Sequence, residues 1–118
     1  MRREYPDAPI VTVGLIVRRD HRVLLVQRGK EPNKGRWSIP GGAVEPGETL
    51  RAAGEREVRE ECNIEARAGA VAGVFEAIVP DTSGRTRFHY VIIDFLAEYV
   101  SGKLSAADDT ADARWVSL

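Results

Sequence analysis

The chain has 118 residues, of which 43% are hydrophobic and 30% are charged, as in a single globular domain with one core. Its formal net charge of −1 provides no overall attraction to nucleic acid or to an anionic membrane, and we expect neither as a partner. No apolar run approaches the ~18 residues that a membrane span needs, and the first residues lack the apolar stretch of a signal peptide.

Two β-rich runs open the chain. Residues 10–17 and 23–26 are apolar, and the polar pair Asp20 and His21 marks a turn between them, so we predict a β-hairpin. The segment 29–36 (GKEPNKGR) is polar and rich in residues that interrupt regular structure, which predicts a loop.

A helix is predicted from Thr49, a suitable N-cap, to about Cys62, because Asn63 tolerates the left-handed conformation that ends many helices. Ahead of it, Pro40-Gly41-Gly42 predicts a sharp turn that a β-branched residue could not make. Gly54 predicts a close approach of the helix to a neighbouring backbone. Cys62 is the only cysteine and cannot form an intramolecular disulfide, which fits a reducing cytoplasm.

More β-rich runs follow the helix. Residues 71–79 and 88–95 are joined by Asp81-Thr82-Ser83-Gly84, which predicts a second hairpin. Residues 108–113 are interpreted as a polar loop, and residues 114–116 as a last short strand. Many strands with one central helix favour an α+β or mixed-sheet domain over a repeated βαβ pattern.

The predicted helix places Glu57, Glu60 and Glu61 on one face, since they lie three and four residues apart. The same stripe begins at Leu50 and runs through small residues, and we expect this first half to pack on the protein body. Three crowded carboxylates repel one another unless a cation lies among them. Mg²⁺ prefers oxygen ligands and leaves room for substrate phosphates, so the segment predicts a metal–phosphate site. Arg56 lies beside the stripe, and we expect it to hold one of the glutamates.

The alternative is a solvated helix whose charges pair along its surface. Glu55–Arg59 and Arg56–Glu60 have the i,i+4 spacing of such pairs. The position of the acids on an otherwise apolar or small stripe favours the metal site.

Residues 42–64 resemble the signature of the Nudix hydrolase family, G-x5-E-x7-R-E-U-x-E-E-x-G-U, in which U is aliphatic. The matching residues are Gly42, Glu48, Arg56, Glu57, Val58, Glu60, Glu61 and Ile64. Asn63 stands where the family has Gly, and because Asn also tolerates a left-handed turn we expect metal binding to persist. The resemblance continues in residues 24–28, 35–42 and 113–118, and so covers nearly the whole chain.

The resemblance implies an α/β fold: an α/β/α sandwich around a mixed β-sheet, with the signature forming a loop–helix–loop. It implies one domain over residues 1–118, and we expect the family's closing helix, which would follow Leu118, to be absent. The implied metal is Mg²⁺, with Mn²⁺ able to substitute. The implied metal ligands are Glu57, Glu60, Glu61 and Gly42, while Glu48 and Arg56 orient them.

A base must take the proton of the attacking water. Glu60 or Glu61 is one candidate, acting through the metal. An acid outside the helix is the other, and we choose Asp109, with its neighbour Asp108 left open.

Residues near the entry to the signature are candidates for substrate binding. Arg28, Lys34 and Arg36 are expected to meet phosphate, and Trp37 to stack on a base. Glu76 is a candidate for a ribose or a metal. The alternatives are ordinary surface positions for the charged residues and a packing role for Trp37.

The implied activity is hydrolysis of the diphosphate linkage in a nucleoside diphosphate derivative such as ADP-ribose. The alternatives are a (d)NTP pyrophosphohydrolase and a nucleotide-binding sensor with weak catalysis. The intact acids favour a hydrolase over a sensor. The expected partner is a small nucleotide, and relatives suggest a homodimer.

Overall fold

The computed structural model describes residues 2–31 and 33–118. The elements, in chain order, are β1 (Ile10–Arg19), β2 (Arg22–Arg28), β3 (Trp37–Ser38), β4 (Gly41–Ala43), α1 (Leu50–Cys62), β5 (Glu65–Pro80), β6 (Thr86–Ser101) and β7 (Thr110–Ser117). In this part of the chain the strands form a seven-stranded sheet of order β3-β2-β1-β6-β5, with β4 added to β1 and β7 to β2. The β1–β6 pair is parallel and the other pairs are antiparallel, so the sheet is mixed, as predicted.

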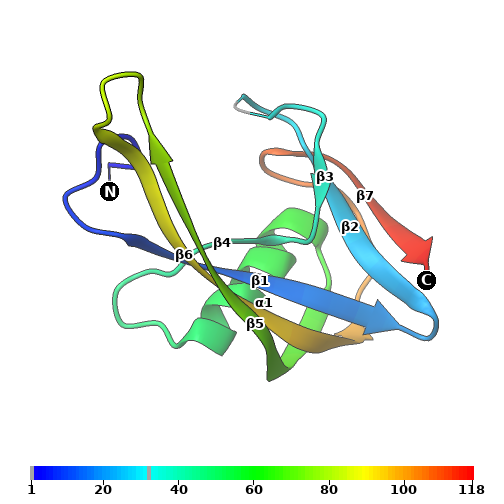
Figure 1. Ribbon diagram of the computed structural model, residues 1–118. Helices are drawn as coiled ribbons and strands as arrows, with labels where there is room; N and C mark the ends of the chain where they lie inside the picture. Colours follow the sequence, from blue (N-terminus) through cyan, green and yellow to red (C-terminus); the bar gives the residue numbers. More distant parts are fainter. Residues whose placement is uncertain (1, 32) are drawn as a thin grey trace.

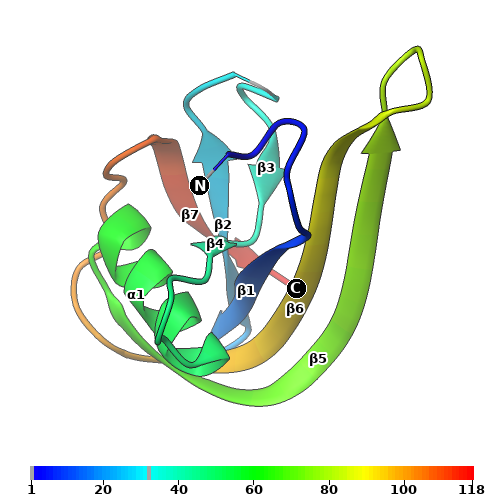
Figure 2. The same cartoon turned by 90° about the vertical axis from the view of Figure 1, so that its left-hand side faces the viewer.

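The sheet divides into two leaves that splay apart (Figure 1). β1 and β2 pair only next to their shared turn, because β4 occupies the place beside β1 at residues 12–14. One leaf contains β4, β1, β6 and β5, and the other contains β3, β2 and β7. Figure 2 shows β5 and β6 as a long curved hairpin along one side of the molecule.

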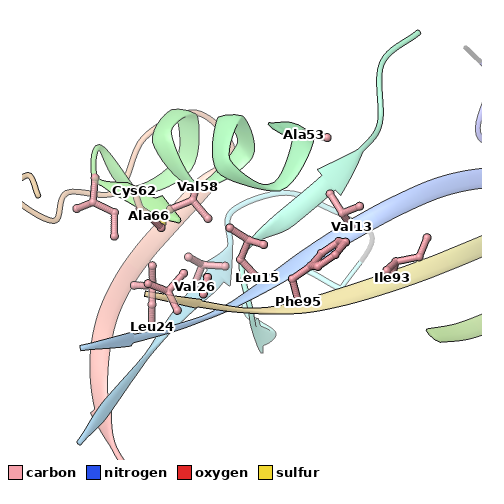
Figure 3. Packing of buried hydrophobic residues seen from close by; sticks show 13 residues of the cluster. Val13, Leu15, Leu24, Val26, Ala53, Val58, Cys62, Ala66, Ile93 and Phe95 are labelled. Atoms are coloured by element: carbon pink, nitrogen blue, oxygen red, sulfur yellow. The ribbon is translucent and has the colours of Figure 1, made fainter. Parts of the chain in front are cut away.

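The helix packs on one face of the first leaf (Figure 3). Its buried residues are Ala53, Gly54, Val58 and Cys62. The predicted stripe was therefore wrong in part. Leu50, which was expected to pack on the protein body, is 37% exposed, and the acids lie beside the buried residues of the helix and not in line with them. A Cβ at Gly54 would lie 2.7 Å from Leu15 Cδ2, so the predicted close approach is to a side chain and not to a backbone.

The ends of the helix follow the prediction. The Thr49 hydroxyl accepts a hydrogen bond from the Ala52 N–H, and Asn63 adopts a left-handed conformation with φ 60°. Both predicted hairpins are confirmed, although β5 and β6 extend well beyond the predicted runs. The loop predicted over residues 108–113 is wrong at its end, because β7 already begins at Thr110 and pairs with β2.

The face of the first leaf away from α1 is called the open face below. Side chains alternate along a strand, so the residues next to the core residues Val13 and Leu15 point to it. Within the described residues α1 is the sole helix, and it supplies one of the two helical layers of the predicted sandwich. No helix in this part of the chain is long and apolar enough to cross a bilayer.

Candidate active site

The helix meets the free edge of β4, and this contact builds the acidic site. One edge of β4 pairs with β1 through residues 41–43. On its other edge, Arg56 Nη2 donates to the Ala43 carbonyl at 3.1 Å and the Gly41 N–H donates to the Glu61 carboxylate. Side chains of the helix therefore satisfy backbone groups that another strand would otherwise pair.

Arg56 is the cationic centre of the site. Its Nε and Nη2 donate to both oxygens of Glu48, at 2.7 and 3.0 Å, while Nη1 donates to Glu57 at 2.9 Å and to Glu60 at 3.2 Å. The hydrogen bonds from Arg56 lower the pKa of Glu48 to about 2, and the same partners raise the pKa of Arg56. The prediction that Arg56 holds one glutamate is confirmed, and the structure shows that it holds three: Glu48, Glu57 and Glu60.

Glu57 and Glu61 form a hydrogen-bonded pair of carboxylates. Burial, followed by the hydrogen bond and the charge of Glu57, raises the pKa of Glu61 to about 8. Two carboxylates in hydrogen-bond contact cannot both ionise cheaply, so they share a proton unless a cation replaces it.

The alternative of a helix with paired surface charges is confirmed for one of its two pairs. Arg56 and Glu60 do pair, at 3.2 Å. Glu55 and Arg59 do not, because Arg59 pairs with Glu65 at 2.9 Å while Glu55 accepts from the Ala68 N–H.

The donor set fits a hard divalent cation. Mg²⁺ is usually held by one or two carboxylates and keeps waters and substrate phosphates as its other ligands. Glu57 and Glu61 supply two such carboxylates, while the third acid, Glu60, is half exposed and turned to Arg56. Within residues 2–31 and 33–118, no three His, Cys, Asp or Glu side chains stand close enough together to hold a metal ion unaided.

Gly41 and Gly42 lie in strand β4 and do not form the predicted sharp turn, since neither has a positive φ. They are required for space instead. A Cβ at Gly42 would lie 2.5 Å from the Glu57 carboxyl carbon, and one at Gly41 would collide with the Val13 carbonyl. Glycine at these positions lets the acidic helix approach the strand.

We predict that Gly42→Ala displaces Glu57 and lowers hydrolytic activity by ~10–100-fold, a loss typical of a site moved by about an ångström. The fold should survive, because only a flexible side chain must shift. Steady-state kinetics and circular dichroism on the variant check this. Gly84→Ala, at a hairpin tip where nothing lies within 4 Å, is the control: its φ of 86° makes alanine costly to stability, but activity should stay at the wild-type level. Equal activity of the two variants would contradict the steric argument.

The loop before β7 brings one of its two acids toward the site. It is attached to the end of α1 by the Ala107 N–H, which donates to the Glu61 carbonyl at 2.9 Å. Asp108 contributes to the raised pKa of Glu61 through its negative charge. The side chain of Asp109 instead forms an ion pair with Lys30 at 2.9 Å on the surface.

The predicted substrate residues lie on different parts of the two leaves. Arg28 and Arg36 are exposed at the base of the loop between β2 and β3, and Arg28 Nε donates to the Lys30 carbonyl at 3.4 Å. Trp37 is 37% exposed on β3, with the Arg114 guanidinium 5.4 Å from its ring centre. Glu76 is exposed on β5 and pairs with Val91, so it lies on the face of the leaf that carries α1. The structure thus brings the first three near one another and leaves Glu76 apart.

Sequence reasoning missed the Gly41 N–H and the Ala43 carbonyl as parts of the site. Backbone groups carry no residue-type signal, and only the pairing of β4 leaves them free for α1. That Asp109, of the two loop acids, pairs with Lys30 depends in the same way on how the loop attaches to α1.

In the part of the chain that the structure describes, a mixed sheet and one helix form an α/β protein whose carboxylates gather around a central arginine. The model of the NUDIX domain family matches residues 8–118, and the chain belongs to the Nudix family. The prediction from the signature is thereby confirmed.

Three known proteins illustrate the likeness. The chain is 36% identical over 110 residues to the ADP-ribose pyrophosphatase of Methanocaldococcus jannaschii, covering 93% of this chain and 63% of that enzyme. It superposes with a TM-score of 0.80 on a MutT NUDIX hydrolase from Burkholderia pseudomallei, at 28% identity, over 94% of this chain and 84% of that one. A bifunctional NMN adenylyltransferase/ADP ribose pyrophosphatase from Francisella tularensis, complexed with AMP and a manganese ion, gives a TM-score of 0.66 at 34% identity, over 94% and 34%. The chain spans less than two thirds of the length of the curated archaeal enzyme.

Proposed function

We propose that the protein hydrolyses the diphosphate linkage of a nucleoside diphosphate derivative such as ADP-ribose, with Mg²⁺ as cofactor. The observation that carries this proposal is the Glu57–Glu61 pair, held against β4 beside the Arg56 centre. The similarity to an archaeal ADP-ribose pyrophosphatase supports the substrate class.

Each residue of the acidic site is assigned one role in this reaction. Glu57 and Glu61, with Gly42 beside them and Glu60 on the outer side, would hold Mg²⁺, which neutralises phosphate oxygens and lowers the pKa of a bound water. Arg56 and Glu48 position the carboxylates through the hydrogen bonds described above. Asp109, the loop acid predicted to accept the proton of the attacking water, is paired with Lys30 at 2.9 Å, so we assign that role to its neighbour Asp108, on the loop that the Ala107 N–H attaches to the end of α1.

The test is turnover of a substrate panel with Mg²⁺, with Mn²⁺ and with chelator. It contains ADP-ribose, NADH, nucleoside triphosphates, oxidised dGTP and diadenosine polyphosphates. We expect ADP-ribose to be cleaved to AMP and ribose 5-phosphate only when metal is present. Release of pyrophosphate from triphosphates would identify a (d)NTP pyrophosphohydrolase instead, and tight binding without turnover would identify a sensor.

We also propose a cytoplasmic location and a homodimer. Cys62 is a buried free thiol, which suits a reducing compartment. Large apolar side chains lie exposed on the long hairpin, among them Val74 on β5 at 65% and Val100 on β6 at 51%, and they provide a surface for a second copy.

A further inference from the structure

One carboxylate on the open face has no part in the acidic site. Asp94 lies on β6 between Gly14 of β1 and Gly73 of β5, with which it is paired in register. It is partly buried, and its burial raises its pKa. Within the described residues no donor forms a hydrogen bond or ion pair with its side chain. No side-chain oxygen in the described residues is both fully buried and without a partner, so solvent still reaches the Asp94 carboxylate, and a ligand hydroxyl can take the place of that water.

The Asp94 side chain leans toward the acidic site. A Cβ at Gly14 would lie 2.5 Å from Asp94 Oδ1 and 2.7 Å from Ile39 Cδ1, so the carboxylate lies over Gly14. Gly14 pairs with Gly41, whose N–H donates to Glu61. Neighbouring strands are ~4.8 Å apart, so the carboxylate is about one strand spacing from the edge of the acidic site.

An exposed aromatic ring lies on the other side of Asp94. Phe75 shares the open face with Gly73, two residues before it on β5. A Cβ at Gly73 would lie 2.7 Å from Phe75 Cζ, so the ring leans over Gly73, beside Asp94. Phe75 is 55% exposed and offers a ring face to a ligand.

We infer that the open face binds the nucleoside half of the substrate, with the ribose hydroxyls donating to Asp94 and the base stacking on Phe75. This inference rests on the proposed function, which places the diphosphate at Glu57 and Glu61. Across the strands, the diphosphate then lies at the edge of β4, the ribose at the Asp94 carboxylate over β1, and the base at Phe75 over β5, two strands further on. A carboxylate accepts hydrogen bonds from a ribose hydroxyl, and bases stack on aromatic side chains irrespective of their identity.

The ribose contact is tested by calorimetric titration of AMP and 2′-deoxy-AMP into the metal-free protein. The wild type should bind AMP ~10-fold more tightly, which is the effect of one hydrogen bond to a charged group. Asp94→Asn should lose that preference, whereas Glu98→Gln, an exposed carboxylate on the same strand paired with Arg18, should keep it. Equal affinity of the wild type for the two ligands would overturn the assignment without recourse to any variant.

The stacking contact has its own matched pair of variants. Phe75→Ala should weaken both ligands by ~5–100-fold without changing the ratio between them. Ile78→Ala removes a side chain that is also 55% exposed on β5 but, three residues along, points to the opposite face. The same loss in both variants, or in neither, would contradict a base-binding role for Phe75.

These tests separate the inference from the proposed function, because binding is measured without turnover. A ribose preference that depends on Asp94, together with no hydrolysis in the substrate panel, would support the subsite and contradict the hydrolase. Hydrolysis of the panel without a ribose preference would contradict the subsite alone.

Discussion

Glu61→Gln is expected to lower Mg²⁺-dependent hydrolysis by at least ~100-fold and, at the same time, to stabilise the metal-free protein at alkaline pH. The first effect follows because the variant loses one of two facing carboxylates, and 100-fold corresponds to ~2.7 kcal/mol of transition-state stabilisation. The second follows because the same proximity that suits a cation is repulsive without one.

The sign of the pH effect comes from the raised pKa of Glu61, about 8 in the folded protein against an ordinary 4.5. The protein is most stable with respect to this group below the unfolded pKa, and that stability is lost as the pH rises through about 8. Gln cannot ionise, so we expect the variant to exceed the wild type by ~1–3 kcal/mol at pH 9 and to match it at pH 5.

Thermal unfolding in chelator at both pH values measures this difference. Glu65→Gln is the matched control, since Glu65 is a surface carboxylate paired with Arg59. A Glu61→Gln variant with the pH dependence of the wild type would show that Glu57 and Glu61 do not share a proton. A variant that keeps full activity would remove Glu61 from the metal site.

Arg56→Ala is expected to be the most damaging single change in both stability and activity. The side chain is only 18% exposed and forms hydrogen bonds with Glu48, Glu57, Glu60 and the Ala43 carbonyl. Its removal leaves several carboxylates without their cation, at a cost of ~2–4 kcal/mol and a fall in melting temperature of ~10 °C. Activity should fall in parallel, because Glu57 and Glu48 lose their orientation.

Two further variants decide between the charge and the geometry of Arg56. Arg56→Lys keeps the charge but cannot bind Glu48 through two nitrogens, so we expect an intermediate loss. Arg59→Ala removes an arginine that is 51% exposed and forms a single surface ion pair, and its cost should stay within ~1 kcal/mol. Unfolding curves for the three proteins would contradict the central role of Arg56 if Arg56→Ala matched Arg59→Ala.

Local features of the chain were predictable because they depend on neighbouring residues. Thr49 and Asn63 cap the helix as their side chains dictate, and the turns at Asp20 and after Asp81 join the expected strands. Glycines were harder to interpret. Residue type predicts a turn at Gly41 and Gly42, yet these glycines instead leave room for Glu57 and for the Val13 carbonyl, and a sequence does not distinguish these two uses.

Residue types and a spacing of 3.6 residues per turn are enough to predict the family, the helix with its caps, and which carboxylates lie on adjacent turns. What those carboxylates face depends on the fold of the whole chain. The pairing of β4 with β1 exposes the strand edge that Arg56 and Glu61 contact, and the β1–β6–β5 register sets Asp94 beside Gly14. These contacts join residues far apart in the chain, and the packing of the whole sheet, not any local preference, brings them together.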